Sequence, residues 1–218
     1  LVSVVHSKGA SARVMATAIP ELMCYAKEPK QLPLLMKKAT TIVCGPGLGQ
    51  SRWAKASLNE VLQSTLPLVI DADGLNNLPK KIYKHNWILT PHPGEAAKLL
   101  GISTEEVQKD RLQTAKNLLS KFGGVIVLKG AGTLVVTEHE LPWICTAGNA
   151  GMASGGMGDV LAGLIGGLVA QNMSLFNAAR LGVLIHAMAG DLEEVMGQRG
   201  MIASDLFLHI RSLLNPSL

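Results

Sequence analysis

The sequence predicts an α/β protein whose central sheet is mostly parallel and carries helices on both faces. Unbroken apolar runs of strand length recur along the chain, and amphipathic helical patterns separate the first five of them. Parallel strands buried on both faces have such unbroken apolar sequences, and crossover helices join successive parallel strands. No repeat, low-complexity tract or change of composition marks a boundary, so we expect residues 1–218 to form a single domain.

Apolar runs of strand length occur throughout the first two thirds of the chain. In order, they are residues 1–5 (LVSVV), 40–45 (TTIVCG), 66–72 (LPLVIDA), 86–91 (NWILTP), 124–130 (GVIVLKG), 132–138 (GTLVVTE) and 141–147 (LPWICTA). The first run predicts a buried strand, because nearly all of its residues are apolar. A short polar turn joins the last two runs, which predicts a hairpin near one edge of the sheet.

Helical periodicity fills the segments between and after these runs. The clearest patterns lie in residues 51–63, 103–122, 175–197 and 204–215. In the first pattern, Trp53 and Leu58 are expected to face the core. The second predicts one long helix that begins with a capping box formed by Ser103 and Glu106.

Composition and charge exclude several classes of protein. Hydrophobic residues make up 48% of the chain and charged residues 17%, which is typical of a folded domain. The net charge of +4 is dispersed and only 4% of residues are aromatic, so nucleic acid is not an expected partner. The longest uncharged apolar run, residues 160–170, is too short to span a bilayer, so no membrane segment is predicted.

The cysteines indicate the redox environment. Cys24, Cys44 and Cys145 are odd in number and widely spaced, and no CxxC pair occurs. This pattern fits neither a disulfide framework nor a zinc site. A reducing, cytoplasmic location is therefore expected.

Five loops that follow successive strands carry glycine, acidic, imidazole and amine groups. They are residues 44–50 (CGPGLGQ), 71–76 (DADGLN), 90–95 (TPHPGE), 129–133 (KGAGT) and 147–159 (AGNAGMASGGMGD). Ligands of an open parallel sheet bind outside the carboxyl ends of its strands. Each loop alone is explained equally well as a turn or a helix cap. Their occurrence after successive strands predicts a single ligand site at one rim of the sheet.

The last of these loops opens a helix at Asp159. The unpaired N–H groups and the dipole of a helix N-terminus suit an anion such as phosphate, and they favour the ionised form of Asp159. Glycines recur at Gly163, Gly166 and Gly167 on one helical face, which predicts very close packing against a neighbour. A tight helix start without any ligand is the alternative interpretation.

The charges of the loop residues suggest a separate role for each. Lys129 and the amides that follow it suit phosphate, whereas Asp159 suits a hydroxyl group from which it can accept a proton. With magnesium neutralising the phosphates, this arrangement favours phosphoryl transfer. The sequence contains no Walker A motif, and no GxGxxG follows its first strand, which disfavours the two commonest nucleotide folds.

The motifs GPGLG, TPHPGE, KGAGT and GNAGMASGGMGDVLAG, in this order, resemble those of the ADP-dependent NAD(P)H-hydrate dehydratase family, which has a ribokinase-like fold. The similarity covers almost the whole chain and includes PELM at position 20, DADGLN at position 71 and RGMIASDL at position 199. The resemblance implies a metabolite-repair lyase of the cytoplasm. Such an enzyme removes water from the S-form of hydrated NADH or NADPH, consumes ADP with Mg²⁺, and releases AMP and phosphate. Relatives also suggest a homotetramer.

The resemblance also implies roles for individual residues. Asp159 would contact the hydrate and serve as the base, and Gly47 and His92 would line the hydrate pocket. The adenine nucleotide would be bound by Lys129, Gly130, Ala131, Gly132, Thr133 and Gly158. No residue is predicted to be a metal ligand.

Family members carry another strand and a glycine-rich loop upstream of the strand that opens this chain. The N-terminal part of the ribokinase-like fold is therefore expected to be missing. Many bacterial relatives are fused at the N-terminus to an NAD(P)H-hydrate epimerase domain, and the abrupt start of the chain is consistent with such a fusion. A ribokinase-like kinase acting on a small-molecule alcohol and a non-catalytic nucleotide-binding module remain as alternatives.

Overall fold

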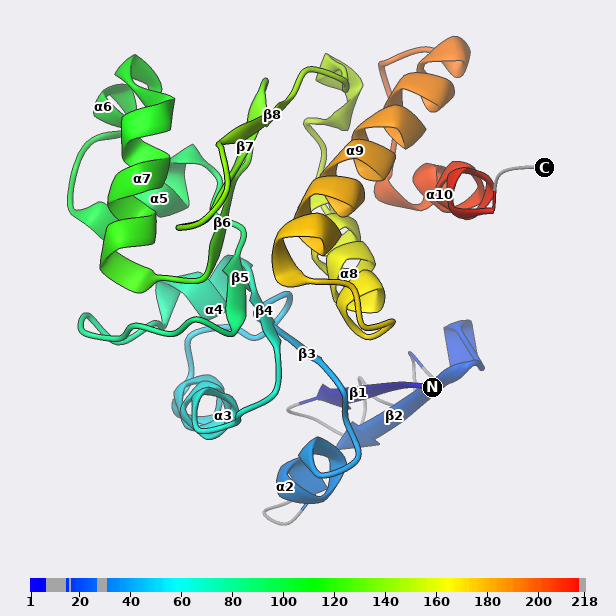
Figure 1. The fold of residues 1–218 in the computed structure, drawn as a ribbon. Helices are drawn as coiled ribbons and strands as arrows, with labels where there is room; N and C mark the ends of the chain where they lie inside the picture. The colour runs from blue at the N-terminus through cyan, green and yellow to red at the C-terminus, as the bar shows by residue number, and fades with distance from the viewer. Residues whose placement is uncertain (7–14, 16, 27–30, 216–218) are drawn as a thin grey trace.

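The computed structural model describes residues 1–6, 15, 17–26 and 31–215 (Figure 1). Its strands form a two-stranded sheet and a six-stranded sheet. The strands are β1 (Val2–His6), β2 (Leu22–Ala26), β3 (Ile42–Cys44), β4 (Leu68–Ile70), β5 (Trp87–Leu89), β6 (Val125–Leu128), β7 (Thr133–Val136) and β8 (Trp143–Cys145).

Helices follow most of the strands. They are α2 (Gln31–Met36), α3 (Arg52–Leu62), α4 (Ala72–Asn76), α5 (Pro93–Leu100), α6 (Thr104–Lys109), α7 (Arg111–Phe122), α8 (Met157–Val169), α9 (Leu175–Glu193) and α10 (Leu206–Leu214). Short 3-10 turns cover Ala150–Met152, Glu194–Met196 and Ala203–Asp205. The predicted α/β class is confirmed.

The six-stranded sheet keeps its strands in chain order from β3 to β8. Strands β3, β4, β5 and β6 pair in parallel, whereas β7 pairs antiparallel with both β6 and β8. The hairpin predicted near one edge is therefore confirmed. Because β3 to β6 run in the same direction, the loops after them emerge at one rim of the sheet.

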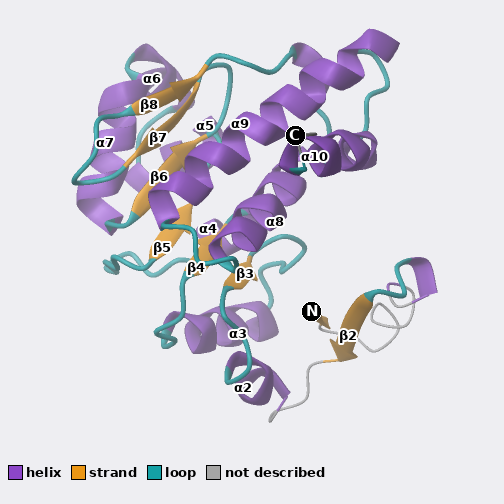
Figure 2. Cartoon of the chain, turned by 45° about the vertical axis from the view of Figure 1, so that its right-hand side comes forward, coloured by secondary structure: helices purple, strands orange, loops and turns teal. Residues whose placement is uncertain are grey.

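Both faces of the sheet are buried, as the unbroken apolar strands predict. In β4, Leu68 and Ile70 join one hydrophobic core, and Val69 between them joins the other. Helices α5 and α7 cover the first face, and α8 and α9 cover the second (Figures 1 and 2). Successive side chains of a strand point to opposite faces, so one apolar run supplies both cores.

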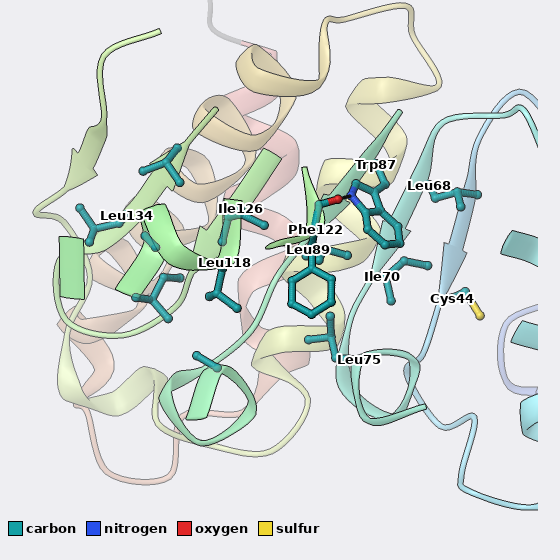
Figure 3. Close-up of a cluster of buried hydrophobic side chains, with 14 of the residues drawn as sticks. Cys44, Leu68, Ile70, Leu75, Trp87, Leu89, Leu118, Phe122, Ile126 and Leu134 are labelled. Carbon is teal, nitrogen blue, oxygen red and sulfur yellow. Dashed lines mark hydrogen bonds between the residues drawn. The ribbon is translucent and has the colours of Figure 1, made fainter. Parts of the chain in front are cut away.

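Trp87 fixes β5 against the end of α7 within the first core (Figure 3). Its side chain is fully buried, and its indole N–H donates to the carbonyl oxygens of Phe122 and Gly123, each at 3.2 Å. A buried indole N–H needs such a partner. This contact aligns β5 with β6, and thereby brings the loops after the two strands together.

The N-terminal prediction is wrong in two respects. Residues 2–6 form a strand, but its side chains are exposed or half-buried. It pairs in parallel with β2, a strand that the sequence analysis does not predict. The two form a separate sheet, which stands clear of the six-stranded sheet in Figure 2. The first run therefore has no buried environment to match its apolar composition.

The helix predicted over residues 103–122 is divided into α6 and α7. Its capping box is confirmed, because Ser103 and Glu106 each bond the other's backbone N–H. The division falls at Asp110, which has an extended conformation and accepts a bond from the N–H of Gln113. An aspartate in this position starts a new helix, and the break makes Arg111 the first residue of α7.

The glycines of α8 only partly confirm the predicted close packing. A Cβ atom on Gly166 would lie 2.4 Å from Val43, so this position does require glycine. Gly163 and Gly167 have no neighbour within 4 Å of such an atom. Close contact with β3 is therefore limited to one turn of the helix.

Two further observations bear on the environment of the protein. Cys24, Cys44 and Cys145 are free, and burial raises the pKa of the Cys44 thiol to about 11. A thiol with so high a pKa is a poor nucleophile. In the described part of the chain, none of the helices has the length and apolar character needed to span a membrane.

Candidate active site

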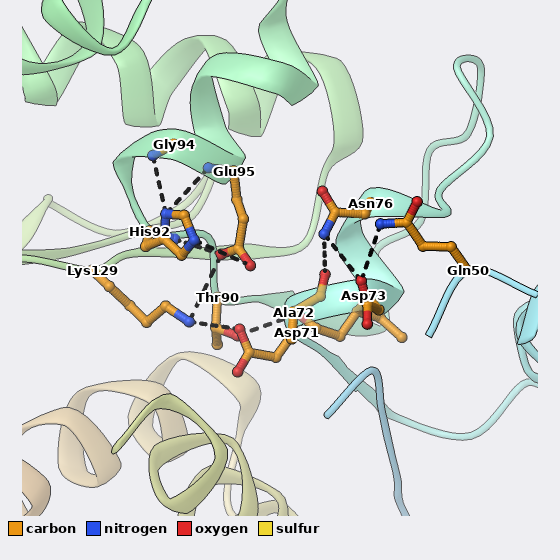
Figure 4. A network of polar contacts seen from close by, with 11 residues as sticks. Gln50, Asp71, Ala72, Asp73, Asn76, Thr90, His92, Gly94, Glu95 and Lys129 are labelled. Carbon is orange, nitrogen blue, oxygen red and sulfur yellow. Dashed lines mark hydrogen bonds and ion pairs between the residues drawn. The ribbon is translucent and has the colours of Figure 1, made fainter. Parts of the chain in front are cut away.

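An ion pair joins two of the predicted loops at the rim of the sheet. Lys129 follows β6 and Asp71 follows β4, and the Lys129 Nζ lies 2.6 Å from Asp71 Oδ1 (Figure 4). Asp71 is only 1% exposed. A buried carboxylate requires a charged or hydrogen-bonding partner, so the ammonium of Lys129 is held in a fixed place.

The TPHPGE loop adds a second carboxylate beside this pair. Glu95 lies in the first turn of α5, 3.9 Å from the Lys129 Nζ, and it accepts a bond of 2.8 Å from the backbone N–H of His92. The backbone N–H of Lys129 donates to the carbonyl of Pro91 at 2.9 Å. Lys129 is thereby bound to this loop through both its side chain and its main chain.

His92 caps α5 and also presents one edge to solvent. Its Nδ1 accepts bonds from the N–H groups of Gly94 and Glu95, at 3.0 and 3.3 Å. A nitrogen that accepts carries no proton, so the proton of the neutral ring is on Nε2. The side chain is 55% exposed. The structural interpretation as a cap and the functional interpretation as a ligand contact are therefore compatible.

The start of α8 faces the Lys129–Asp71 pair. A Cβ atom on Gly158 would lie 3.2 Å from Lys129 Nζ and 3.5 Å from the nearer Asp71 oxygen. Glycine at this position therefore leaves room between the helix and the ammonium. The structure thus brings Lys129, Gly158 and Asp159 together, as predicted, although they come from loops 29 residues apart (129 to 158).

The surroundings of Asp159 shift its pKa in a direction that the helix N-terminus alone does not give. Desolvation by partial burial raises the pKa of the Asp159 carboxyl, and the nearby Asp71 carboxylate raises it further, whereas Lys129 lowers it. The first two effects outweigh the attraction of the ammonium. A raised pKa makes a carboxylate a better proton acceptor.

Negative charge exceeds positive charge at this point of the rim. Asp71, Glu95 and Asp159 lie around Lys129, so a polyphosphate needs additional positive charge in order to bind there. Magnesium bound jointly by phosphate oxygens and one or two carboxylates supplies that charge, and these carboxylates fit it. No group of three or more His, Cys, Asp or Glu side chains in the described residues could hold a metal ion.

The KGAGT loop presents backbone N–H groups. Those of Gly130, Ala131 and Gly132 have no acceptor among the described residues. The Thr133 hydroxyl is engaged within the loop, because it donates to the carbonyl of Gly130 at 2.9 Å. Free amides beside a lysine ammonium suit an anion, which is the role that the sequence analysis predicts for this loop.

The glycine-rich loop before α8 is fixed from the opposite side. Asp191 of α9 accepts bonds from the Gly148 N–H at 2.9 Å and from the Asn149 side-chain amide at 3.1 Å. Asn149 also accepts from the N–H of Gly151 at 2.9 Å. Gly156 then begins α8 in the left-handed conformation, which glycine adopts without strain.

His186 of α9 lies behind the same helix start. It is 8% exposed, and a hydrogen bond links it to the Met157 backbone. Burial, together with the Lys129 charge, lowers the pKa of His186 to about 4, although the bond to the Met157 backbone acts in the opposite direction. The imidazole is therefore neutral at physiological pH.

Gly47 lies in the loop after β3, on the same rim. The loop is anchored to the DADGLN segment, because Gly49 donates its N–H to Asp73 at 3.1 Å and Gly45 packs directly on the carbonyl of Asp71. Gly47 itself is exposed, with a φ of 64°. The structure places Gly47 in a loop held against the DADGLN segment, and no contact joins it to His92 in the described residues.

A family model described as NAD(P)H-hydrate dehydratase matches residues 1–211. The chain belongs to the NAD(P)H-hydrate dehydratase family. The bifunctional NAD(P)H-hydrate repair enzyme Nnr of Coxiella burnetii is 55% identical over 200 residues, which are 90% of this chain and 41% of that protein. The ADP-dependent (S)-NAD(P)H-hydrate dehydratase of Neisseria meningitidis is 40% identical over 184 residues, covering 79% of this chain and 62% of that protein.

Solved structures have the same fold. The Bacillus subtilis ADP/ATP-dependent NAD(P)H-hydrate dehydratase, co-crystallised with ATP/Mg²⁺, has a TM-score of 0.81 at 26% identity, covering 93% of this chain and 74% of that one. A ribokinase-like superfamily protein of Enterococcus faecalis has a TM-score of 0.83 at 27% identity, covering 98% and 75%. The predicted family and ribokinase-like fold are confirmed. The chain spans about two fifths of the length of the bifunctional relatives it matches.

Three residues at this site of the dehydratase-family chain are absent from the predicted set. Asp71 and Glu95 lie in loops that the sequence analysis does identify, and their position directly after buried strands was the available signal. Arg111, whose guanidinium contacts the KGAGT loop, begins a helix in a segment with no motif. No sequence pattern distinguishes it from the other surface arginines.

Proposed function

We propose that this chain catalyses the ADP-dependent dehydration of the S-form of hydrated NADH or NADPH, with release of AMP and phosphate. One observation carries the proposal: Lys129 of the KGAGT loop and the Gly158–Asp159 start of α8 meet at a single point of the rim. A phosphate donor held by one loop therefore lies beside a carboxylate base on the other. Membership of the dehydratase family and the names of the relatives support the choice of substrate.

The nucleotide is held by the KGAGT loop and α8. The amides of Gly130, Ala131 and Gly132 and the Lys129 ammonium bind its phosphates, and Gly158 lets them approach. When bound, Mg²⁺ neutralises phosphate charge, and Asp71, Glu95 and Asp159 are the carboxylates available to hold it. Gly47 and the exposed part of the His92 ring contact the hydrate.

The chemistry begins at the hydroxyl group of the hydrate. Asp159 accepts its proton as the oxygen attacks the terminal phosphorus of ADP, and the bond to the AMP oxygen breaks. The hydroxyl oxygen now carries a phosphoryl group and has become a good leaving group. The electron pair of the ring nitrogen expels phosphate, and loss of a proton from the neighbouring carbon restores the double bond.

A spectrophotometric assay tests the proposal. The full-length protein is given hydrated NADH, Mg²⁺ and ADP, and the absorbance of reduced nicotinamide is followed beside that of Asp159→Asn. We expect recovery of NADH only with ADP, and a loss of about 10²- to 10⁴-fold in the Asn variant, because it has no general base. Calorimetric ADP binding by both proteins shows that the variant is folded and loaded.

Other outcomes separate this proposal from its alternatives. ADP binding without recovery of NADH, followed by phosphorylation of an added thiazole or hydroxymethylpyrimidine alcohol, would identify a kinase of the same fold. Binding that supports no turnover with either substrate class, and that is unchanged in Asp159→Asn, would identify a nucleotide-binding module. Either result overturns the dehydratase proposal.

The proposal extends to assembly and location. Exposed apolar side chains gather on α9 and α10, among them Met188, Leu192, Phe207 and Leu208, and they support self-association into a homotetramer. Light scattering that gives a monomer mass would contradict this. The three free cysteines support a cytoplasmic location, which cell fractionation tests.

A further inference from the structure

Arg111 lies directly behind the KGAGT loop and contacts it through the main chain. Its Nη2 donates to the carbonyl oxygens of Leu128, Lys129 and Gly132, at 3.2, 3.3 and 3.3 Å. Its Nη1 donates to the Gln108 side chain at 3.1 Å. One nitrogen of the planar, positively charged guanidinium therefore donates to three carbonyl groups of the same short loop.

These contacts determine where the amides of the loop point. In a trans peptide, the C=O of one residue and the N–H of the next lie on opposite sides of the same plane. The carbonyls of Leu128, Lys129 and Gly132 face Arg111, so the N–H groups of Lys129, Gly130 and Thr133 face away from it. The Lys129 N–H donates to the carbonyl of Pro91 at 2.9 Å, which agrees with this geometry.

Gly130 is adapted to the same guanidinium. It has a φ of 135°, and a Cβ atom there would lie 3.0 Å from Arg111 Nη1. The turn therefore depends on a residue without a side chain in order to lie flat on the arginine. Burial lowers the pKa of Arg111, but a guanidinium remains charged near neutrality. Its charge lies on the side of the loop opposite to the free amides.

We propose that Arg111 is a positioning residue for the nucleotide, which holds the backbone of the KGAGT loop so that the free Gly130 amide faces the phosphates, and which adds positive charge behind the loop. The inference rests on the proposed nucleotide site but not on the dehydration reaction. Arg111 acts through the backbone and touches neither substrate. Its effect is therefore on nucleotide binding, while the hydrate pocket and the Asp159 base are left intact.

Two substitutions and a matched control test the inference on the full-length protein. Arg111→Lys keeps the positive charge but removes the planar guanidinium, and Arg111→Ala removes both. The control, Gln108→Ala, removes only the side chain to which Nη1 donates. Steady-state kinetics give the KM for ADP, the KM for the hydrate and kcat, and calorimetry gives the Kd for ADP. Methylguanidine at millimolar concentration is added to Arg111→Ala in order to replace the missing group.

We expect the KM and the Kd for ADP to rise about 10- to 100-fold in both arginine variants, which corresponds to lost bonds to a charged donor. The KM for the hydrate and the kcat at saturating ADP should stay within about three-fold. Gln108→Ala should resemble the wild type, and methylguanidine should restore part of the ADP affinity of Arg111→Ala. A residue that only stabilised the fold would change the unfolding temperature without this selective effect or this rescue.

Each remaining outcome is distinguishable. Equal losses for ADP and hydrate, or unchanged ADP affinity in both arginine variants, overturn the role of Arg111 while the dehydratase proposal stands. A wild-type protein that binds ADP in an Arg111-dependent way but restores no NADH overturns the dehydratase proposal and leaves the positioning role supported. A wild-type protein that binds no ADP overturns both.

Discussion

The two loops that meet at the rim are held by opposite charges acting on opposite backbone groups. In the KGAGT loop, the cation Arg111 binds carbonyl oxygens. In the glycine-rich loop, the anion Asp191 binds the Gly148 N–H and the Asn149 side chain. The contacts of Arg111 leave amides of the KGAGT loop free for a ligand, whereas Asp191 occupies the Gly148 amide of the glycine-rich loop. In the glycine-rich loop, the N–H groups of Gly148, Gly151, Met152 and Ala153 are therefore engaged within the protein.

This difference teaches that glycine content alone does not identify the anion-binding part of a loop. The long loop contains more glycines than KGAGT, yet part of its backbone is occupied by Asp191 and Asn149. Whether an amide is free to bind an anion depends on which side of its peptide group, the C=O or the N–H, faces a protein side chain. Three changes test this comparison.

The largest effect is expected at Lys129. Lys129→Met removes the ammonium paired with Asp71, which is 1% exposed, and leaves a buried carboxylate without its charged partner. We expect the free energy of unfolding in urea at pH 7 to fall by about 3–5 kcal/mol. Adding Asp71→Asn to this variant should recover part of the loss, because the buried charge is then gone. A loss below about 1 kcal/mol would show that water already solvates Asp71.

Acidification should weaken the glycine-rich loop through His186. The unfolded imidazole titrates near 6.5 and the folded one near 4, so between these pH values the unfolded state binds a proton that the folded state excludes. Stability therefore falls as pH decreases through this window. A difference of about 2.5 pKa units, at about 1.4 kcal/mol per unit, corresponds to roughly 3 kcal/mol at pH 4.

Urea unfolding of the wild type and of His186→Leu at pH 7, 5.5 and 4 measures this effect. The carboxylates titrate in both proteins, so the difference between the two curves isolates His186. Hydrogen exchange should show the amides of residues 148–158 losing protection at pH 4.5 before those of residues 128–133. Parallel unfolding curves would contradict the neutral, buried state of His186.

The smallest effect is expected at Asp191. Asp191→Ala leaves the Gly148 N–H and the Asn149 amide without their acceptor, and we expect a loss of about 1–2 kcal/mol in the free energy of unfolding. Asp191→Asn retains one carbonyl acceptor and should lose less than half of that. Urea unfolding checks both values, with ADP affinity as the second readout. Because Asp191 supports the other loop, its loss should weaken ADP binding less than loss of Arg111.

Much of the site follows from strand order in the sequence. Lys129, Gly158, Asp159 and His92 were predicted because each lies in a loop directly after a strand or opens a helix, and a parallel sheet brings such loops to one rim. The structure adds the capping role of His92, which no spacing indicates. It also shows that the Asp159 pKa is raised, because burial desolvates the carboxyl and because Asp71, 88 positions earlier in the chain (159 minus 71), adds to the shift.

The fold could be predicted where the local pattern and the tertiary environment agree. The strands β4 to β6 are apolar and fully buried, so the apolar runs identified them, whereas β1 is apolar yet exposed or half-buried and β2 was missed. The break at Asp110 was also missed, because the apolar positions continue across it while one side-chain bond to Gln113 restarts the helix. Local hydrogen bonds of this kind leave no trace in a hydrophobic pattern.

The sequence by itself determined the family, the fold class and the loops that carry the site, because motif order and strand periodicity are local properties of the chain. Only the tertiary structure decided which groups support those loops. The partners of Lys129, Gly148 and the KGAGT carbonyls are Asp71, Asp191 and Arg111, which come from other elements. The energy of a charge or hydrogen bond depends on distance and burial, and neither quantity is encoded by position along the chain.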